Sequence, residues 1–180
     1  MADGDQGGGA VCAITLGGNV GDVGAAFEGA IAQLAATAGM TILARSPWYR
    51  TPPMGPPQPD FWNGCVLLRT TRSPEDLLTI LQAIEAAFGR QRHLRWGPRT
   101  LDLDLIFYGD RQLHTDELTL PHPGFRDRAF VLVPLADVAP DWCDPASGQT
   151  VAQLRQALDC SQVVPVKRDR DPHPAPLKSN

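Results

Sequence analysis

RWGPRTLDLDLIFY, residues 95–108, joins a basic, turn-forming loop directly to a segment in which leucine alternates with aspartate. Successive side chains of a strand point to opposite faces and the strand rises about 3.3 Å per residue, so Asp102 and Asp104 should share one face, roughly 6 to 7 Å apart. The opposite face, toward the core, then takes Leu101, Leu103 and Leu105. The alternation predicts a half-buried strand that presents a pair of carboxylates.

This pair of carboxylates, next to a cluster of arginines, indicates a magnesium-nucleotide site. Mg²⁺ binds one or two protein carboxylates and completes its shell with water and substrate phosphates. Guanidinium groups suit a bidentate grip on phosphate oxygens, and four of them precede the strand: Arg90, Arg92, Arg95 and Arg99. Alone, an Asp-x-Asp also fits an ordinary half-exposed strand, and basic residues after a helix also complement its dipole. Their adjacency favours the site.

The surrounding sequence predicts the element order β-α-β-β-α-β. Asp22 N-caps a helix from Val23 to about Ala38, and Ser73 caps a second helix that begins at Pro74 and stops at Gly89. Strands are expected at residues 11–16, 41–49, 62–70 and 101–108, with a proline-rich loop at 52–60. The order predicts an α+β fold with a ferredoxin-like antiparallel sheet and both helices on one face. Extra elements are expected near Leu118 (extended), at 128–135 (helix) and at 150–158 (helix).

Length and composition predict one domain with loose ends. The 180 residues suffice for one core, at residues 11–166, whereas the glycine-rich head (1–10) and the charged, proline-rich tail (167–180) are expected to be disordered. A net charge of −4 argues against a general nucleic-acid or membrane-surface binder. The sequence has four scattered cysteines, no apolar span of about 18 residues and no basic-then-apolar leader. We therefore expect a cytoplasmic monomer with reduced thiols and no membrane contact.

The chain resembles the 6-hydroxymethyl-7,8-dihydropterin pyrophosphokinases, folate-pathway enzymes that move the terminal diphosphate of ATP onto a pterin alcohol. Four blocks between about Ile14 and Pro140 carry the resemblance: LGGN at 16–19, YRTPP at 49–53 with PDFWN at 59–63, RWGPRTLDLD at 95–104, and PHP at 121–123 with Arg128 and Phe130. The resemblance implies a ferredoxin-like fold and a Mg²⁺-dependent diphosphotransferase, with ATP as co-substrate, that produces AMP and the pterin diphosphate.

The resemblance also implies a role for individual residues. Asp102 and Asp104 would hold two Mg²⁺ ions, while Arg90 and Arg99 would stabilise the transferring group. The implied ATP-binding residues are Gln82, Glu85, Arg92, Arg95, Trp96, Thr119, His122 and Arg128. The implied pterin-binding residues are Thr51, Pro53, Met54, Phe61, Asn63, Trp96 and Phe130, with the two phenylalanines sandwiching the ring. From spacing alone, Gln82 and Glu85 suit an ordinary solvated helix pair equally well, and an isolated phenylalanine is more often core.

Loops, departures from the family pattern and rival functions complete the expectations. Loops 52–60 and 89–98 are predicted to be lids that order as substrates bind. Glu117 and Gly124 stand where relatives often carry arginine, which leaves Arg126 as the candidate to compensate for the missing positive charge.

One rival function is that of a nucleotidyltransferase, which directs attack on the α-phosphorus and releases pyrophosphate. The other is a ferredoxin-like ligand- or RNA-binding module without turnover, which the paired carboxylates disfavour.

Overall fold

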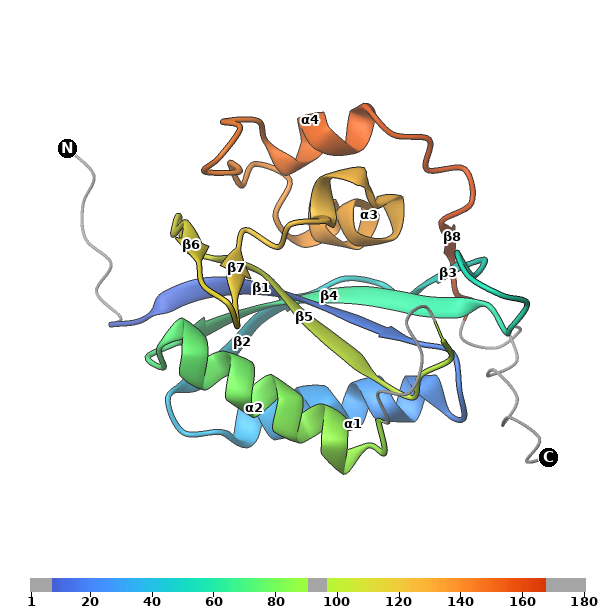
Figure 1. Cartoon of the computed structure of the whole chain (residues 1–180), viewed down its shortest axis with the longest axis horizontal. Coiled ribbons are helices and arrows are strands. Elements are labelled where there is room, and N and C mark those ends of the chain that lie inside the picture. The colour runs from blue at the N-terminus through green and yellow to red at the C-terminus, as the bar shows by residue number, and fades with distance from the viewer. Residues whose placement is uncertain (1–7, 91–96, 168–180) are drawn as a thin grey trace.

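The structure, a computed structural model, describes residues 8–90 and 97–167. Its elements are β1 (Ala10–Gly18), α1 (Val23–Ala36), β2 (Met40–Arg45), β3 (Tyr49–Thr51), β4 (Phe61–Thr70), α2 (Pro74–Ala87), β5 (Asp102–Tyr108), β6 (Leu113–His114), β7 (Thr119–Leu120), the 3-10 helix η1 (Phe125–Asp127), α3 (Ala129–Val138), α4 (Val151–Gln156) and β8 (Val164–Pro165). Figure 1 shows three layers, with α1 and α2 on one face of the sheet and α3 and α4 on the other. The prediction of a mixed fold with helices packed on an antiparallel sheet is confirmed.

The sheet runs in the order β5-β1-β4-β3-β8, with β2 also paired to β4, and these pairings are antiparallel. The central strand is β1, which pairs with β4 along its whole length and with β5 on its other side. Gly17 of β1 lies opposite Asn63 of β4 and opposite Asp102 of β5. Directly opposed residues project from the same face, so this row of three residues shares one side of the sheet.

Local sequence signals explain where the two long helices begin and end. The Asp22 side chain accepts the Ala25 N–H at 2.9 Å, and the Ser73 hydroxyl accepts the Asp76 N–H at 3.1 Å, which satisfies otherwise unpaired donors of the first turns. Gly89 adopts φ +77° just after α2, a conformation that favours glycine and ends the helix. All three predicted boundaries are confirmed.

Each face of the sheet buries its own core. On the α1/α2 face, Phe27 and Leu81 pack in one cluster with the predicted inward leucines of the last long strand, Leu101, Leu103 and Leu105. On the α3/α4 face, Phe107 stacks on Trp142 and meets Phe125 edge to face. The two cores therefore pack against β5 from both sides. Among residues 8–90 and 97–167, no helix is long and apolar enough to cross a membrane.

The predicted single strand at 41–49 is wrong, because the chain breaks at residues 46–48 into β2 and β3. Pro47 has no N–H to donate to a ladder. The Ser46 hydroxyl accepts the Cys65 N–H at 2.9 Å, and Trp48 packs so closely on Gly64 that a Cβ there would lie 2.3 Å from its ring. The extended piece expected near Leu118 corresponds to β7, but its partner β6 and the strand β8 were missed. The predicted end of α3 at Leu135 is three residues short of Val138, and the helix predicted at 150–158 is three residues longer than α4.

Candidate active site

A pocket lies where the ends of β1, β4 and β5 meet the loop after β3 and the start of α3. Its cavity volume is about 110 Å³, and the pocket is open to solvent on one side. Its lining residues are Thr15, Leu16, Gly17, Thr51, Pro52, Met54, Gly55, Phe61, Asn63, Arg99, Asp102, Asp104, Arg128, Phe130 and Val131. One cavity therefore joins the predicted carboxylates and two predicted arginines to the predicted aromatic pair.

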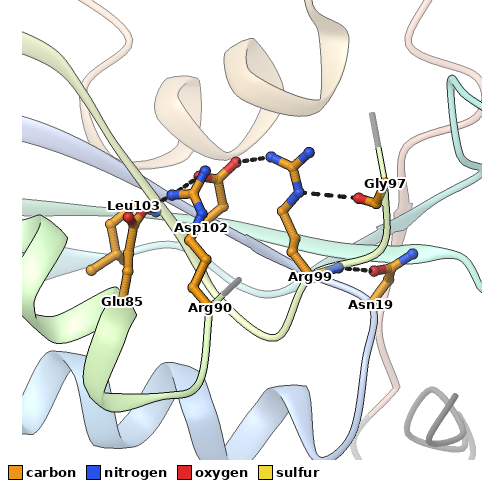
Figure 2. A network of polar contacts seen from close by, with 7 residues as sticks. All are labelled: Asn19, Glu85, Arg90, Gly97, Arg99, Asp102 and Leu103. Atoms are coloured by element: carbon orange, nitrogen blue, oxygen red, sulfur yellow. Dashed lines mark hydrogen bonds and ion pairs between the residues drawn. The ribbon is translucent and has the colours of Figure 1, made fainter. Parts of the chain in front are cut away.

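The carboxylate pair faces this pocket as the alternation predicts. Asp102 contacts two guanidinium groups, Nη1 of Arg99 at 2.6 Å from Oδ2 and Nη1 of Arg90 at 2.6 Å from Oδ1 (Figure 2). Burial, together with the negative charge of Asp102, raises the pKa of Asp104 to about 6, although nearby arginines oppose the shift. Negative charge is thus concentrated at a site where each carboxylate needs a cation.

Glu85 is a buried part of the same network, with only 3% of its surface exposed. Its carboxylate accepts the Leu103 N–H at 2.7 Å and contacts Nη1 of Arg90, so it joins the end of α2 to β5 (Figure 2). Burial raises the pKa of Glu85 to about 7. Gln82 is exposed on the same helix. The alternative of an ordinary solvated pair is therefore wrong, and Glu85 holds Arg90 beside Asp102.

Asn19 fastens three segments of the site together, a role that sequence reasoning missed. Its side chain is fully buried; Nδ2 donates to the Gln58 Oε1 and to the Pro59 carbonyl, and Oδ1 accepts the Arg99 N–H, each at 2.9 Å. Its own N–H donates to the Arg99 carbonyl at 2.9 Å. The available signal was a polar side chain directly after two glycines that end β1, where Gly18 allows a close approach to the Thr100 carbonyl.

The residues expected to bind a flat ring are mostly brought together. Thr51, Met54, Phe61, Asn63 and Phe130 line the pocket, and the Asn63 Nδ2 donates to the Thr51 Oγ1 at 2.9 Å. Pro52 lines the described pocket, whereas the expected Pro53 does not. Six of the wall residues were not among the predicted site residues: Thr15, Leu16, Gly17, Pro52, Gly55 and Val131. Three expected residues, Arg92, Arg95 and Trp96, lie outside the described residues, as does much of the predicted lid at 89–98.

The segment before α3 brings Arg128 into the pocket wall, whereas His122 and Thr119 are not among the described wall residues. Arg128 lines the pocket, whereas the Thr119 hydroxyl contacts Nδ1 of His114 at 3.3 Å on the β6–β7 hairpin. Burial and the charge of Arg128 lower the pKa of His122, which keeps its ring neutral at neutral pH.

Arg126 does not offer the compensating charge that was expected of it. Its Nε and Nη2 bind the two carboxylate oxygens of the fully buried Asp144, each at 2.7 Å. A buried, bidentate pair is costly to break, so this guanidinium is committed to joining η1 to the α3–α4 loop.

Comparisons with known proteins agree with this geometry. Residues 13–140 match the family described as 7,8-dihydro-6-hydroxymethylpterin-pyrophosphokinase. A 2-amino-4-hydroxy-6-hydroxymethyldihydropteridine pyrophosphokinase of Synechocystis is 58% identical over 153 residues, which cover 85% of this chain and 78% of the relative. The protein of the same name from Methylorubrum extorquens is 46% identical over 149 residues, 82% of this chain and 93% of the relative. A solved Plasmodium falciparum HPPK-DHPS chain shares the fold with a TM-score of 0.68 at 14% identity; the match covers 85% of this chain but 46% of that longer one.

Proposed function

The chain belongs to the 7,8-dihydro-6-hydroxymethylpterin-pyrophosphokinase family, and from this premise we infer that it catalyses the pyrophosphokinase step of folate biosynthesis. In this reaction the hydroxymethyl oxygen of 6-hydroxymethyl-7,8-dihydropterin attacks the β-phosphorus of ATP, the diphosphate moves to the pterin, and AMP leaves. The observation that supports it most is a single pocket in which an aromatic, amide-edged half adjoins a half built of carboxylates and arginines.

We propose that the pterin occupies the aromatic half of the pocket. Phe61 and Phe130 come from opposite sides of the wall, β4 and α3, and would sandwich the ring. The Asn63 amide is oriented by the Thr51 hydroxyl, and its carbonyl oxygen and remaining N–H suit the donors and acceptors along a pterin edge. Backbone groups of Thr51, Pro53 and Met54 would complete that edge, with Trp96 covering it.

We propose that Asp102 and Asp104 hold two Mg²⁺ ions. Their hard carboxylate oxygens are the donors that Mg²⁺ prefers. Burial and the neighbouring charge of Asp102 raise the pKa of Asp104 to about 6, and a bound cation would balance this carboxylate charge. When bound, the metal supplies charge neutralisation on the phosphates and alignment of the hydroxyl with the leaving group.

Arg90 and Arg99 are the proposed stabilisers of the transferring diphosphate. Their contacts with Asp102 hold both guanidinium groups beside the carboxylate pair, where the reacting phosphates must lie. Phosphoryl transfer depends mainly on positioning and electrostatic stabilisation, so preset charges supply most of what the reaction needs. Arg128 and His122 adjoin this region and are proposed to bind the triphosphate, as are Arg92 and Arg95. Gln82, Glu85, Trp96 and Thr119 remain proposed ATP contacts, and the burial of Glu85 favours an action through Arg90.

The broader architecture carries further proposals. We propose a ferredoxin-like assignment for the sheet, since the order β5-β1-β4 with β2 beside β4 matches a split βαβ arrangement. We also propose one domain at residues 11–166 and a cytoplasmic monomer that binds neither nucleic acid nor membrane. Residues 1–7 and 168–180 of the tails predicted to be disordered lie outside the described residues. Sedimentation of the full chain at two concentrations tests the monomer, and limited proteolysis of the ends tests the domain limits.

The decisive experiment incubates the full chain with Mg²⁺, ATP and 6-hydroxymethyl-7,8-dihydropterin and resolves the nucleotide products. We expect AMP and pterin diphosphate in equal amounts. Asp102→Asn and Asp104→Asn should each lower turnover roughly 100-fold or more, because a preset charge at the reacting phosphates is lost. Asp110→Asn, at an exposed aspartate in the turn after β5, is the matched control and should leave turnover unchanged.

The same assay separates the rival functions. Pyrophosphate as the product would favour a nucleotidyltransferase, and substrate binding without turnover would favour a ligand-binding module. Of the two rivals, the ligand-binding module leaves the paired carboxylates without the role that their position supports.

A further inference from the structure

Gly124 occupies the turn that leads from β7 into α3, between His122 and Arg128. Its backbone has φ −104° and ψ 8°, a conformation open to residues that carry a side chain. The backbone conformation therefore does not require glycine at this position. The atoms that pack against Gly124 offer a different reason.

The guanidinium group of Arg128 lies against Gly124. A Cβ added to Gly124 would stand 2.9 Å from Cζ, 2.9 Å from Nη2 and 3.1 Å from Nε of Arg128. Three atoms of one planar group at nearly equal distance mean that the flat side of the guanidinium rests on the glycine. Any side chain at position 124 would have to share that space.

Two side chains contact Gly124 from either side. Arg128 lines the cavity, and its Cζ lies 6.0 Å from the centroid of the Phe130 ring. On the other side, the Gly124 N–H donates to Nδ1 of His122 at 3.2 Å. A neutral ring that accepts at Nδ1 carries its proton on Nε2, where it is a donor.

We propose that Gly124 is a positioning residue, whose missing side chain seats the Arg128 guanidinium in the pocket and whose N–H orients His122 as a donor. The inference rests on the proposed function, in which both residues bind the triphosphate.

The test is a double-mutant cycle. Gly124→Ala, Arg128→Ala and the double variant are compared with the wild type for kcat and for KM of MgATP, with Gly8→Ala as control because a Cβ there meets nothing within 4 Å. A guanidinium displaced by a fraction of an ångström should raise KM about three- to tenfold with a smaller change in kcat. In the Arg128→Ala background the same alanine should add nothing, since coupled residues are not additive. An equal effect in both backgrounds, or no effect in the wild type, overturns the proposal.

A second readout does not depend on turnover. The ¹⁵N signals of the Arg128 Nε–H and of the His122 ring are recorded in the same proteins; we expect both to move in Gly124→Ala and neither in Gly8→Ala, and unmoved signals overturn the proposal. A wild type that forms no AMP would defeat the proposed function while leaving these spectra to decide about Gly124. If Gly124→Ala melts at a lower temperature, Arg128→Ala should restore the melting point, and a melting point that stays low also overturns the proposal.

Discussion

Replacement of Asn19 by alanine should loosen three segments of the site at once. The side chain makes three hydrogen bonds from a fully buried position, to Gln58, to Pro59 and to the Arg99 amide. A hydrogen bond contributes about 1 kcal/mol net, and the partners left behind are costly when unpaired. We therefore expect the free energy of unfolding to fall by about 3 kcal/mol, a large share of the roughly 5–15 kcal/mol that holds a domain folded.

Urea unfolding, followed by tryptophan fluorescence, measures this loss. Gln58→Ala is the graded control, because it removes one of the three bonds and should cost about 1 kcal/mol. A loss below about 1 kcal/mol for Asn19→Ala would refute the reasoning, since it would mean that water replaces the three bonds at no cost. Amide hydrogen exchange adds a local test. The Arg99 N–H loses its acceptor in Asn19→Ala and should exchange faster there than in the wild type, whereas its exchange rate should be unchanged in Gln58→Ala.

Three other predictions concern packing, charge and metal. Gly64→Ala places a Cβ 2.3 Å from the Trp48 ring, so we expect a loss of about 1–3 kcal/mol in unfolding free energy and a changed near-ultraviolet dichroism; a spectrum like that of Gly8→Ala would contradict it. Arg126→Met leaves the buried Asp144 without its bidentate partner and should cost about 3 kcal/mol at neutral pH. Burial alone would raise the pKa of Asp144, but its hydrogen bonds, chiefly from Arg126, hold that pKa below 3.8. The stabilisation by this pair is therefore present above pH 3.8 and is lost as the pH falls below it. Urea titrations should show a smaller stability difference between the wild type and Arg126→Met at pH 3 than at pH 7. Chelation of divalent cations with EDTA should abolish turnover and added Mg²⁺ should restore it; turnover that survives chelation would count against the carboxylate site.

Signals that lie within a few residues of one another predicted most of the fold correctly. The alternation around Asp102 and Asp104 fixes both which face is buried and which face carries charge, because strand geometry leaves no other choice. Asp22 and Ser73 bind backbone donors three residues away, so their caps are legible in the sequence. Pro47 was a local signal for the break between β2 and β3, but the contact of Trp48 with Gly64, sixteen residues further on, is in no local pattern.

The same distinction divides the site. The carboxylates and the arginines follow one another in the chain, so their joint presence in the pocket could be anticipated. The role of Asn19 could not, because its partners lie 39, 40 and 80 residues away and meet only after the sheet has formed. The burial of Glu85 likewise requires β5 to lie against the end of α2. Long-range burial of polar side chains is therefore the part of this site that pattern reasoning leaves out.

Gly17 lies between Asn63 and Asp102 in one row across the sheet, and this register fixes the distance between the two strands that flank β1. Neighbouring strands are held about 4.8 Å apart by their backbone hydrogen bonds, so the backbone of Asn63, the proposed pterin contact, and that of Asp102 lie about 10 Å apart whatever the loops do. Gly17 carries no side chain, and a substrate can therefore span the gap across bare backbone. The spacing of the strands therefore limits the length of substrate that the site accepts. An alcohol on a longer side chain would carry its oxygen past the carboxylates. Changes in the loops would alter how fast substrates enter but not this length limit.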